Sequence, residues 1–216
     1  LNGSILFSFG GAALATLFIL ALAKRVGGKA TPVYLALAGT AISAVFVAVT
    51  HMLVVYFQVA QELSFWTAGG ISGISMEQVL LVLPWTLIGI LIAMYVSKSV
   101  TLLSFGEEVA IGLGSNLNRV RVLSGLTVLI LSGSAVALAG PIGFVGLVIP
   151  HITRKLVGID YRLVIPFSAL FGAVLVMIAD VVARIVNPPF ETPLGAITAL
   201  VGVPFFIYLA NRKGGK

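Results

Sequence analysis

The sequence predicts an all-α, polytopic bundle of transmembrane helices. Hydrophobic residues make up 59% of the chain and charged residues only 9%, which is too few to coat a soluble domain of 216 residues. Apolar runs of about 20 residues, the length needed to cross a bilayer, recur along the chain. When these runs are threaded through a membrane, all of the 13 lysines and arginines except Arg184 fall on one side. The net charge of +6 therefore marks cytoplasmic loops and not a surface for nucleic acid.

Six apolar runs are predicted to cross the membrane, and the charges require a seventh, shorter crossing. The six runs lie at about 4–23, 33–57, 79–97, 122–139, 163–183 and 194–210. The basic loops at 98–121 and 151–162 share a side, so two crossings must separate them and Ile142–Pro150 must be one. The loops at 58–78 and 187–193 then lie outside with the N-terminal end, and the basic C-terminal tail lies in the cytoplasm.

The short crossing must be interrupted by non-helical backbone. About nine residues of helix span roughly 14 Å, half of a hydrocarbon core of about 30 Å. Such backbone is tolerated at membrane depth only where protein or water shields it, so we expect it inside the bundle. Its glycines would form the turn and allow neighbouring helices to approach closely, and His151 is interpreted as a hydrogen-bonded structural residue. This broken-helix packing is assigned to Gly140, Pro141, Gly143, Gly146, Pro150 and His151.

The cytoplasmic loop at 102–118 is too long for a simple connection. Ser104 is expected to cap a short helix, with Glu107 completing a capping box, and two glycines would end that helix. Asn116 is expected to start a second short helix. Two short amphipathic helices joined by glycine would form a docking surface. The alternative is a helix that lies on the lipid headgroups.

Few polar residues remain that could carry chemistry. The chain has no cysteine, and its two histidines, His51 and His151, have no carboxylate nearby in the sequence, so we expect neither a metal site nor a cofactor. No GxxxxGK[ST] phosphate-binding motif occurs, so the chain is not expected to hydrolyse ATP. Asp180 and Arg184 are four residues apart near the outer end of one helix, a spacing that permits an ion pair.

Several stretches resemble one known family. Ala137–Arg154, Ala179–Arg184, and Glu191–Gly195 with Thr198–Phe206 are similar to the most recognisable sequences of the permease subunits of bacterial ABC importers for vitamin B12, ferric siderophores and haem, and 102–118 resembles their coupling loop. The resemblance covers the whole chain. Family members have ten transmembrane helices with both ends in the cytoplasm. The resemblance thus implies that residues 1–216 form one partial permease domain that corresponds to the last seven helices.

The resemblance also implies a function, partners and residue roles. It implies import of iron–siderophore complexes, or of a related bulky chelate such as haem or cobalamin, by alternating access in the bacterial cytoplasmic membrane. The partners would be a second permease subunit, identical or paralogous, a cytoplasmic ATPase dimer that hydrolyses the ATP, and an extracytoplasmic substrate-binding protein. Arg184, oriented by Asp180, would receive an acidic residue of the binding protein. The residues expected to couple to the ATPase are Gly106, Glu107, Ala110, Gly112, Leu113 and Gly114.

Two other functions compete with that of an importer. Broken helices at the membrane midplane are typical of ion-coupled secondary transporters, although such a carrier would not need the long cytoplasmic loop. Gly70-Ile71-Ser72-Gly73 fits the GxSG pattern of rhomboid-type intramembrane proteases. That serine is predicted to lie in an outer loop and not at the start of a helix within the membrane, which argues against a protease.

Overall fold

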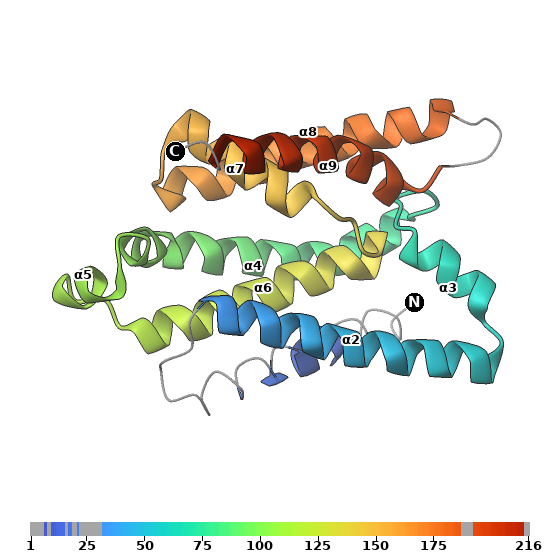
Figure 1. Cartoon of the computed structure of the whole chain (residues 1–216), viewed down its shortest axis with the longest axis horizontal. Helices are drawn as coiled ribbons and strands as arrows, with labels where there is room; N and C mark the ends of the chain where they lie inside the picture. Colours follow the sequence, from blue (N-terminus) through green and yellow to red (C-terminus); the bar gives the residue numbers. More distant parts are fainter. Residues whose placement is uncertain are drawn as a thin grey trace.

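The computed structural model describes residues 7, 10–15, 17, 18, 21, 32–186 and 192–213, and within these ranges the chain is helical with no strand (Figure 1). Four of the described helices are long and apolar enough to cross a membrane, with spans at Leu37–Phe57, Met76–Leu103, Leu117–Ala139 and Tyr161–Val186. The predicted all-α polytopic bundle is therefore confirmed. Half of the predicted run at 4–23 and most of the outer loop with Glu191 lie outside the described residues.

The long helices follow the predicted apolar runs within a few residues. They are α2 Pro32–Phe57, α4 Met76–Leu103, α6 Leu117–Ala139, α8 Tyr161–Val186 and α9 Leu194–Lys213. Three shorter helices join or interrupt them, namely α3 Ala60–Thr67, α5 Glu107–Gly112 and α7 Val145–Val157. The start of α4 is set by a capping box, in which Ser75 Oγ accepts from the Gln78 amide at 3.4 Å and Gln78 Oε1 accepts from the Ser75 amide at 3.0 Å.

The helices alternate in direction, so the bundle has two distinct ends (Figure 1). The α5 end also holds the turn between α7 and α8, and the opposite end holds α3, the 68–75 loop and the start of α9. Helix α4 packs on α6 and α8, and α7 packs on α8 and α9. Because α7 runs back toward the α5 end, two passes separate the loops at 98–121 and 151–162. The basic residues at the α5 end are Lys98, Arg119, Arg121, Arg154, Lys155, Arg162, Arg212 and Lys213.

The caps of the 102–118 loop differ from the prediction. Ser104 ends α4 and its hydroxyl donates to the Thr101 carbonyl at 2.6 Å, so it does not form a capping box with Glu107. Helix α5 instead begins after Gly106, whose φ of 121° favours glycine. The predicted second short helix is also wrong. Asn116 Oδ1 accepts from the Arg119 amide at 3.1 Å and so caps the long helix α6 directly.

The short crossing is longer than predicted and begins later. Residues 140–144 are non-helical, and α7 then continues for 13 residues, which correspond to about 20 Å. Pro150 and His151 therefore lie inside α7 and not at its end. A proline removes one backbone hydrogen bond, and surrounding helices can compensate for that loss in a membrane bundle.

Candidate functional sites at the two ends of the bundle

At the α5 end, a short helix presents apolar side chains away from the bundle. Ala110 is fully buried and marks the face of α5 that packs inward. Glu107 and Glu108 lie in the first turn of the helix, where negative charge is favourable. The apolar side chains left exposed around α5 are Phe105, Val109, Ile111 and Leu113. An exposed apolar group flanked by charges is typical of a protein-docking surface.

The ends of α5 are set by glycines, and one ion pair joins α5 to α6. Gly106 and Gly114 have φ values of 121° and 81°, a region in which side chains are rarely found. The Ser115 amide donates to the Ala110 carbonyl at 2.9 Å and closes the C-terminal end of α5. Glu107 Oε1 lies 2.5 Å from Arg121 Nη2 of α6, and both side chains are about half exposed. Arg121 was expected only to mark topology, and no sequence signal linked it to Glu107.

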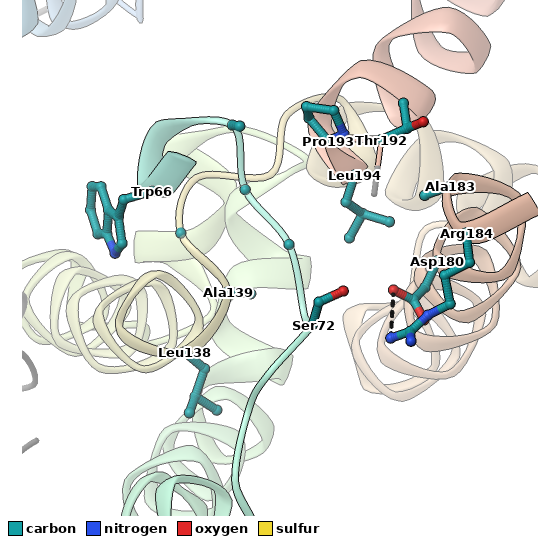
Figure 2. A pocket seen from close by; sticks show the side chains of 14 residues that line it. Trp66, Ser72, Leu138, Ala139, Asp180, Ala183, Arg184, Thr192, Pro193 and Leu194 are labelled. Carbon is teal, nitrogen blue, oxygen red and sulfur yellow. Dashed lines mark hydrogen bonds and ion pairs between the residues drawn. The ribbon is translucent and has the colours of Figure 1, made fainter. Parts of the chain in front are cut away.

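At the opposite end, the structure forms an open pocket of about 840 Å³ (Figure 2). Its lining comes from four places in the chain: the 66–72 segment, the end of α6 with the following loop, the outer part of α8 and the start of α9. The polar side chains in the lining are Ser72, Asp180, Arg184 and Thr192, with Trp66 at its margin. The pocket thus combines an ion pair, hydroxyl groups and an aromatic ring.

Close backbone contacts between three segments hold this pocket in shape. The Gly70 amide donates to the Ala139 carbonyl at 2.9 Å, and the Leu194 amide donates to the Gly69 carbonyl at 3.1 Å. Gly140 has a φ of 65°, and a Cβ there would lie 2.5 Å from the Trp66 carbonyl oxygen. A side chain at Gly140 would therefore push the segments apart.

Asp180 and Arg184 form the ion pair that their spacing permits. Arg184 Nε donates to Asp180 Oδ2 at 2.9 Å. The Asp180 side chain is 17% exposed and the Arg184 side chain is 51% exposed, so the carboxylate is largely covered while the guanidinium is open to solvent. The aspartate thereby holds the arginine at the pocket wall (Figure 2).

Ser72 of the GxSG sequence lies in this pocket and faces Asp180 (Figure 2). It lies in the loop between α3 and α4, as predicted, and not at a helix start. The pocket lining includes neither His51 of α2 nor His151 of α7. In the described part of the chain no group of three metal-ligating side chains occurs either. The pocket therefore lacks the serine–histidine arrangement of a protease.

Between the two ends, the non-helical segment before α7 is packed against α9. Phe144 has a φ of 66°, and a Cβ at Gly202 would lie 2.4 Å from the Phe144 Cβ. The His151 ring packs edge-on against Phe205 with centroids 6.3 Å apart. The glycines of the short crossing were predicted to let neighbouring helices approach closely. Gly143 and Gly146 do not do so, because a Cβ at either position would meet no neighbouring atom within 4 Å.

A polar contact at the α5 end was missed at the sequence level. The Tyr161 amide of α8 donates to Thr101 Oγ1 of α4 at 2.9 Å, and Asp160 Oδ1 lies 3.4 Å from the same hydroxyl. Asp160 precedes an apolar run and could have been identified as the start of a helix. Its partner is 59 residues away in the sequence, so no local pattern could have indicated Thr101.

The comparison with protein families identifies the chain. Residues 1–212 match the FecCD transport family. The chain belongs to this family. Membership in the FecCD family places it among membrane transport proteins, in agreement with the four apolar helices of the described chain.

Two relatives of the FecCD chain are permease proteins of iron import systems. It is 49% identical to the iron(3+)-hydroxamate import system permease protein FhuB of Bacillus subtilis, over 98% of this chain and 55% of FhuB. It is 46% identical to the Fe(3+)-citrate import system permease protein YfmD of the same organism, over 98% of this chain and 62% of that protein. The chain thus spans less than two thirds of the length of these curated relatives.

A solved structure has the same fold. It is described as an inward-facing ABC transporter of the metal-chelate type, and it superposes with a TM-score of 0.81 at 31% identity. The match covers 96% of this chain and 65% of that chain. The helix arrangement in Figure 1 is therefore the arrangement of the matched chain of that transporter over the matched part.

Proposed function

We propose that this chain is the membrane-spanning permease part of an ABC importer that takes up iron–siderophore complexes or a related bulky chelate. The FecCD match over residues 1–212 carries the proposal, and it is supported by the iron-chelate permeases among the relatives. The pocket at the opposite end and the docking surface at the α5 end are the two features that an alternating-access importer needs. ATP hydrolysis comes from a separate subunit, so the chain itself is not an enzyme.

The α5 end is the cytoplasmic side in this proposal, and α5 is the element that docks on the ATPase dimer. Its exposed apolar side chains would enter a cleft on that subunit, while buried Ala110 keeps α5 seated on the bundle. Movement of the ATPase on binding ATP would then displace the end of α4 and the start of α6. A second permease subunit, identical or paralogous, would complete the translocation path, with the C-terminal end of α9 in the cytoplasm.

The pocket at the opposite end receives the extracytoplasmic substrate-binding protein. Arg184 is half exposed and is oriented by Asp180, so it can pair with an acidic side chain on a docked partner. We expect Arg184→Ala to weaken binding of the partner about five- to tenfold, as measured by surface plasmon resonance on the protein in nanodiscs. Arg162→Ala at the α5 end is the control and should leave the affinity unchanged. Equal affinities of Arg184→Ala and wild type would contradict this role.

The decisive test of the importer is association with an ABC ATPase. The chain, and a version extended to the length of its relatives, should co-purify with the cognate ATPase and raise its ATP hydrolysis in lipid. Gly112→Trp, which places a bulky group on the exposed side of α5, should abolish this stimulation. Glu77→Trp at the opposite end is the control and should retain it. If the extended protein neither binds nor stimulates any ABC ATPase, the proposal is wrong, and uptake driven by an ion gradient becomes the function to measure.

A further inference from the structure

We infer that Thr101 is a positioning residue that joins the α5 loop to the turn between α7 and α8, so that the two segments move as one unit. This inference rests on the proposed function, because it concerns how a displacement of α5 reaches the rest of the bundle. It is carried by a hydrogen bond between residues 60 apart in the sequence.

The contact has the geometry of a helix cap supplied by another helix. The Tyr161 amide donates to Thr101 Oγ1 at 2.9 Å, and the Thr101 hydroxyl lies 2.9 Å from the Ser97 carbonyl, to which it can donate. Asp160 Oδ1 lies 3.4 Å away as a second acceptor. Thr101, Asp160 and Tyr161 are all partly buried, so water competes less for these groups than at an exposed site.

Thr101 completes the set of acceptors for the first turn of α8. The first four amides of a helix have no partner within the helix. In α8 the Arg162 amide donates to Asp160 Oδ1 at 3.0 Å, and the Leu163 and Val164 amides donate to the Asp160 carbonyl. The remaining amide, that of Tyr161, uses Thr101 of α4. The start of α8 therefore depends on the position of the end of α4.

The contact lies between the docking surface and the interrupted crossing. On one side, Thr101 is three residues before Ser104, where α4 ends and the α5 loop begins. On the other side, the turn joins α8 to α7, and Arg154 of α7 donates to the Tyr161 hydroxyl at 3.4 Å. A displacement of α5 is thus passed through Thr101 to α7 and α8, the pair of helices that follows the break at 140–144.

The first experiment measures hydrogen exchange in a peptide that spans Asp160–Val164, using the chain in nanodiscs. In Thr101→Val the Tyr161 amide should exchange about fivefold faster, the factor that corresponds to a net hydrogen bond of about 1 kcal/mol. Thr101→Ser keeps the hydroxyl and should match wild type. Thr127→Val is the matched control, because Thr127 is also partly buried and its hydroxyl donates to the Leu123 carbonyl of its own helix. Thr101→Ala is a second variant in case valine prevents folding.

The second experiment adds the ATPase with a non-hydrolysable ATP analogue. In wild type and in Thr101→Ser, exchange should change both in the α5 loop and in the α7–α8 turn, whereas in Thr101→Val the change should stop at the α5 loop. The same response of the turn in Thr101→Val and wild type would overturn the inference, as would unaltered exchange of the Tyr161 amide in the first experiment. If the wild-type α5 loop does not respond to any ATPase, the proposed function fails, while the first experiment still decides whether Thr101 holds the turn.

Discussion

Single residues determine how the non-helical segment before α7 is held. Phe144 adopts a left-handed backbone conformation, which costs a non-glycine residue roughly 1–2 kcal/mol. Packing of its side chain against Gly202 of α9 offsets this cost, because glycine leaves room for the ring. The conformation of one residue in the break thus depends on the absence of a side chain on another helix.

The contact between Phe144 and Gly202 predicts that alanine is more destabilising at Gly202 than at Gly125, a glycine in α6. Gly202→Ala places a Cβ 2.4 Å from the Phe144 Cβ and should lower the free energy of unfolding by about 1–3 kcal/mol. Gly125→Ala in α6 meets no neighbouring atom within 4 Å and should leave stability unchanged or raise it slightly, because alanine favours helix. Thermal unfolding in detergent compares the two variants. An equal midpoint for both would show that the Phe144 packing is not tight.

At the scale of elements, α5 is held on the bundle by few contacts. It is six residues long, fewer than two turns, so its own helical hydrogen bonds cannot keep it folded. Tertiary contacts therefore keep α5 helical. They are the burial of Ala110, the glycines at both ends of the helix and the Glu107–Arg121 ion pair. An exposed ion pair contributes at most about 1 kcal/mol, so its role is to orient α5 rather than to stabilise the fold.

The ion pair predicts rescue by charge exchange. Glu107→Arg alone should reduce stimulation of the ATPase several-fold, because it places two arginines next to each other and shifts α5. The double variant Glu107→Arg with Arg121→Glu restores the pair in reverse and should recover most of the stimulation. The measurement is ATP hydrolysis by the reconstituted complex. If the double variant does not recover activity, Glu107 contacts the ATPase directly in addition to its pairing with Arg121.

At the scale of the whole molecule, alternating helix directions separate a basic end from an end with the pocket. The α5 end carries all of the described basic residues except Arg184, and positive charge is retained in the cytoplasm. In the proposed importer, this separation would place the ATPase surface and the binding-protein surface on opposite sides of the membrane. The alternation includes α7, although it is only half as long as α8.

The orientation can be tested directly, because the chain has no cysteine to interfere with labelling. Ser72→Cys in the pocket should react with a membrane-impermeant maleimide in intact cells. Ser104→Cys at the α5 end should react only after the membrane is permeabilised. Both positions are exposed and lie in loops or at helix ends, so reactivity reports the side of the membrane and not burial. The reverse pattern would invert the proposed topology.

The sequence by itself determined which segments cross the membrane and which end is basic. Whether a segment is apolar enough to cross, and on which side its lysines and arginines stay, depends on its own interaction with the bilayer. Both can therefore be predicted without knowing which helices pack against the segment. The same reasoning correctly required a short pass, now seen as α7, between the basic loops at 98–121 and 151–162. It was wrong about the capping box at Ser104, because a serine hydroxyl can equally bond back to a carbonyl of its own helix.

Only the tertiary structure decided which distant residues meet. The contacts of Gly140 with Trp66, Phe144 with Gly202 and Thr101 with Tyr161 each join segments far apart in the chain. Such contacts depend on how whole helices cross, and the identity of one residue carries no information about a partner on another helix. The sequence therefore established the long helices, their order and their direction, whereas the pocket and the Thr101 contact exist only because folding brings their parts together.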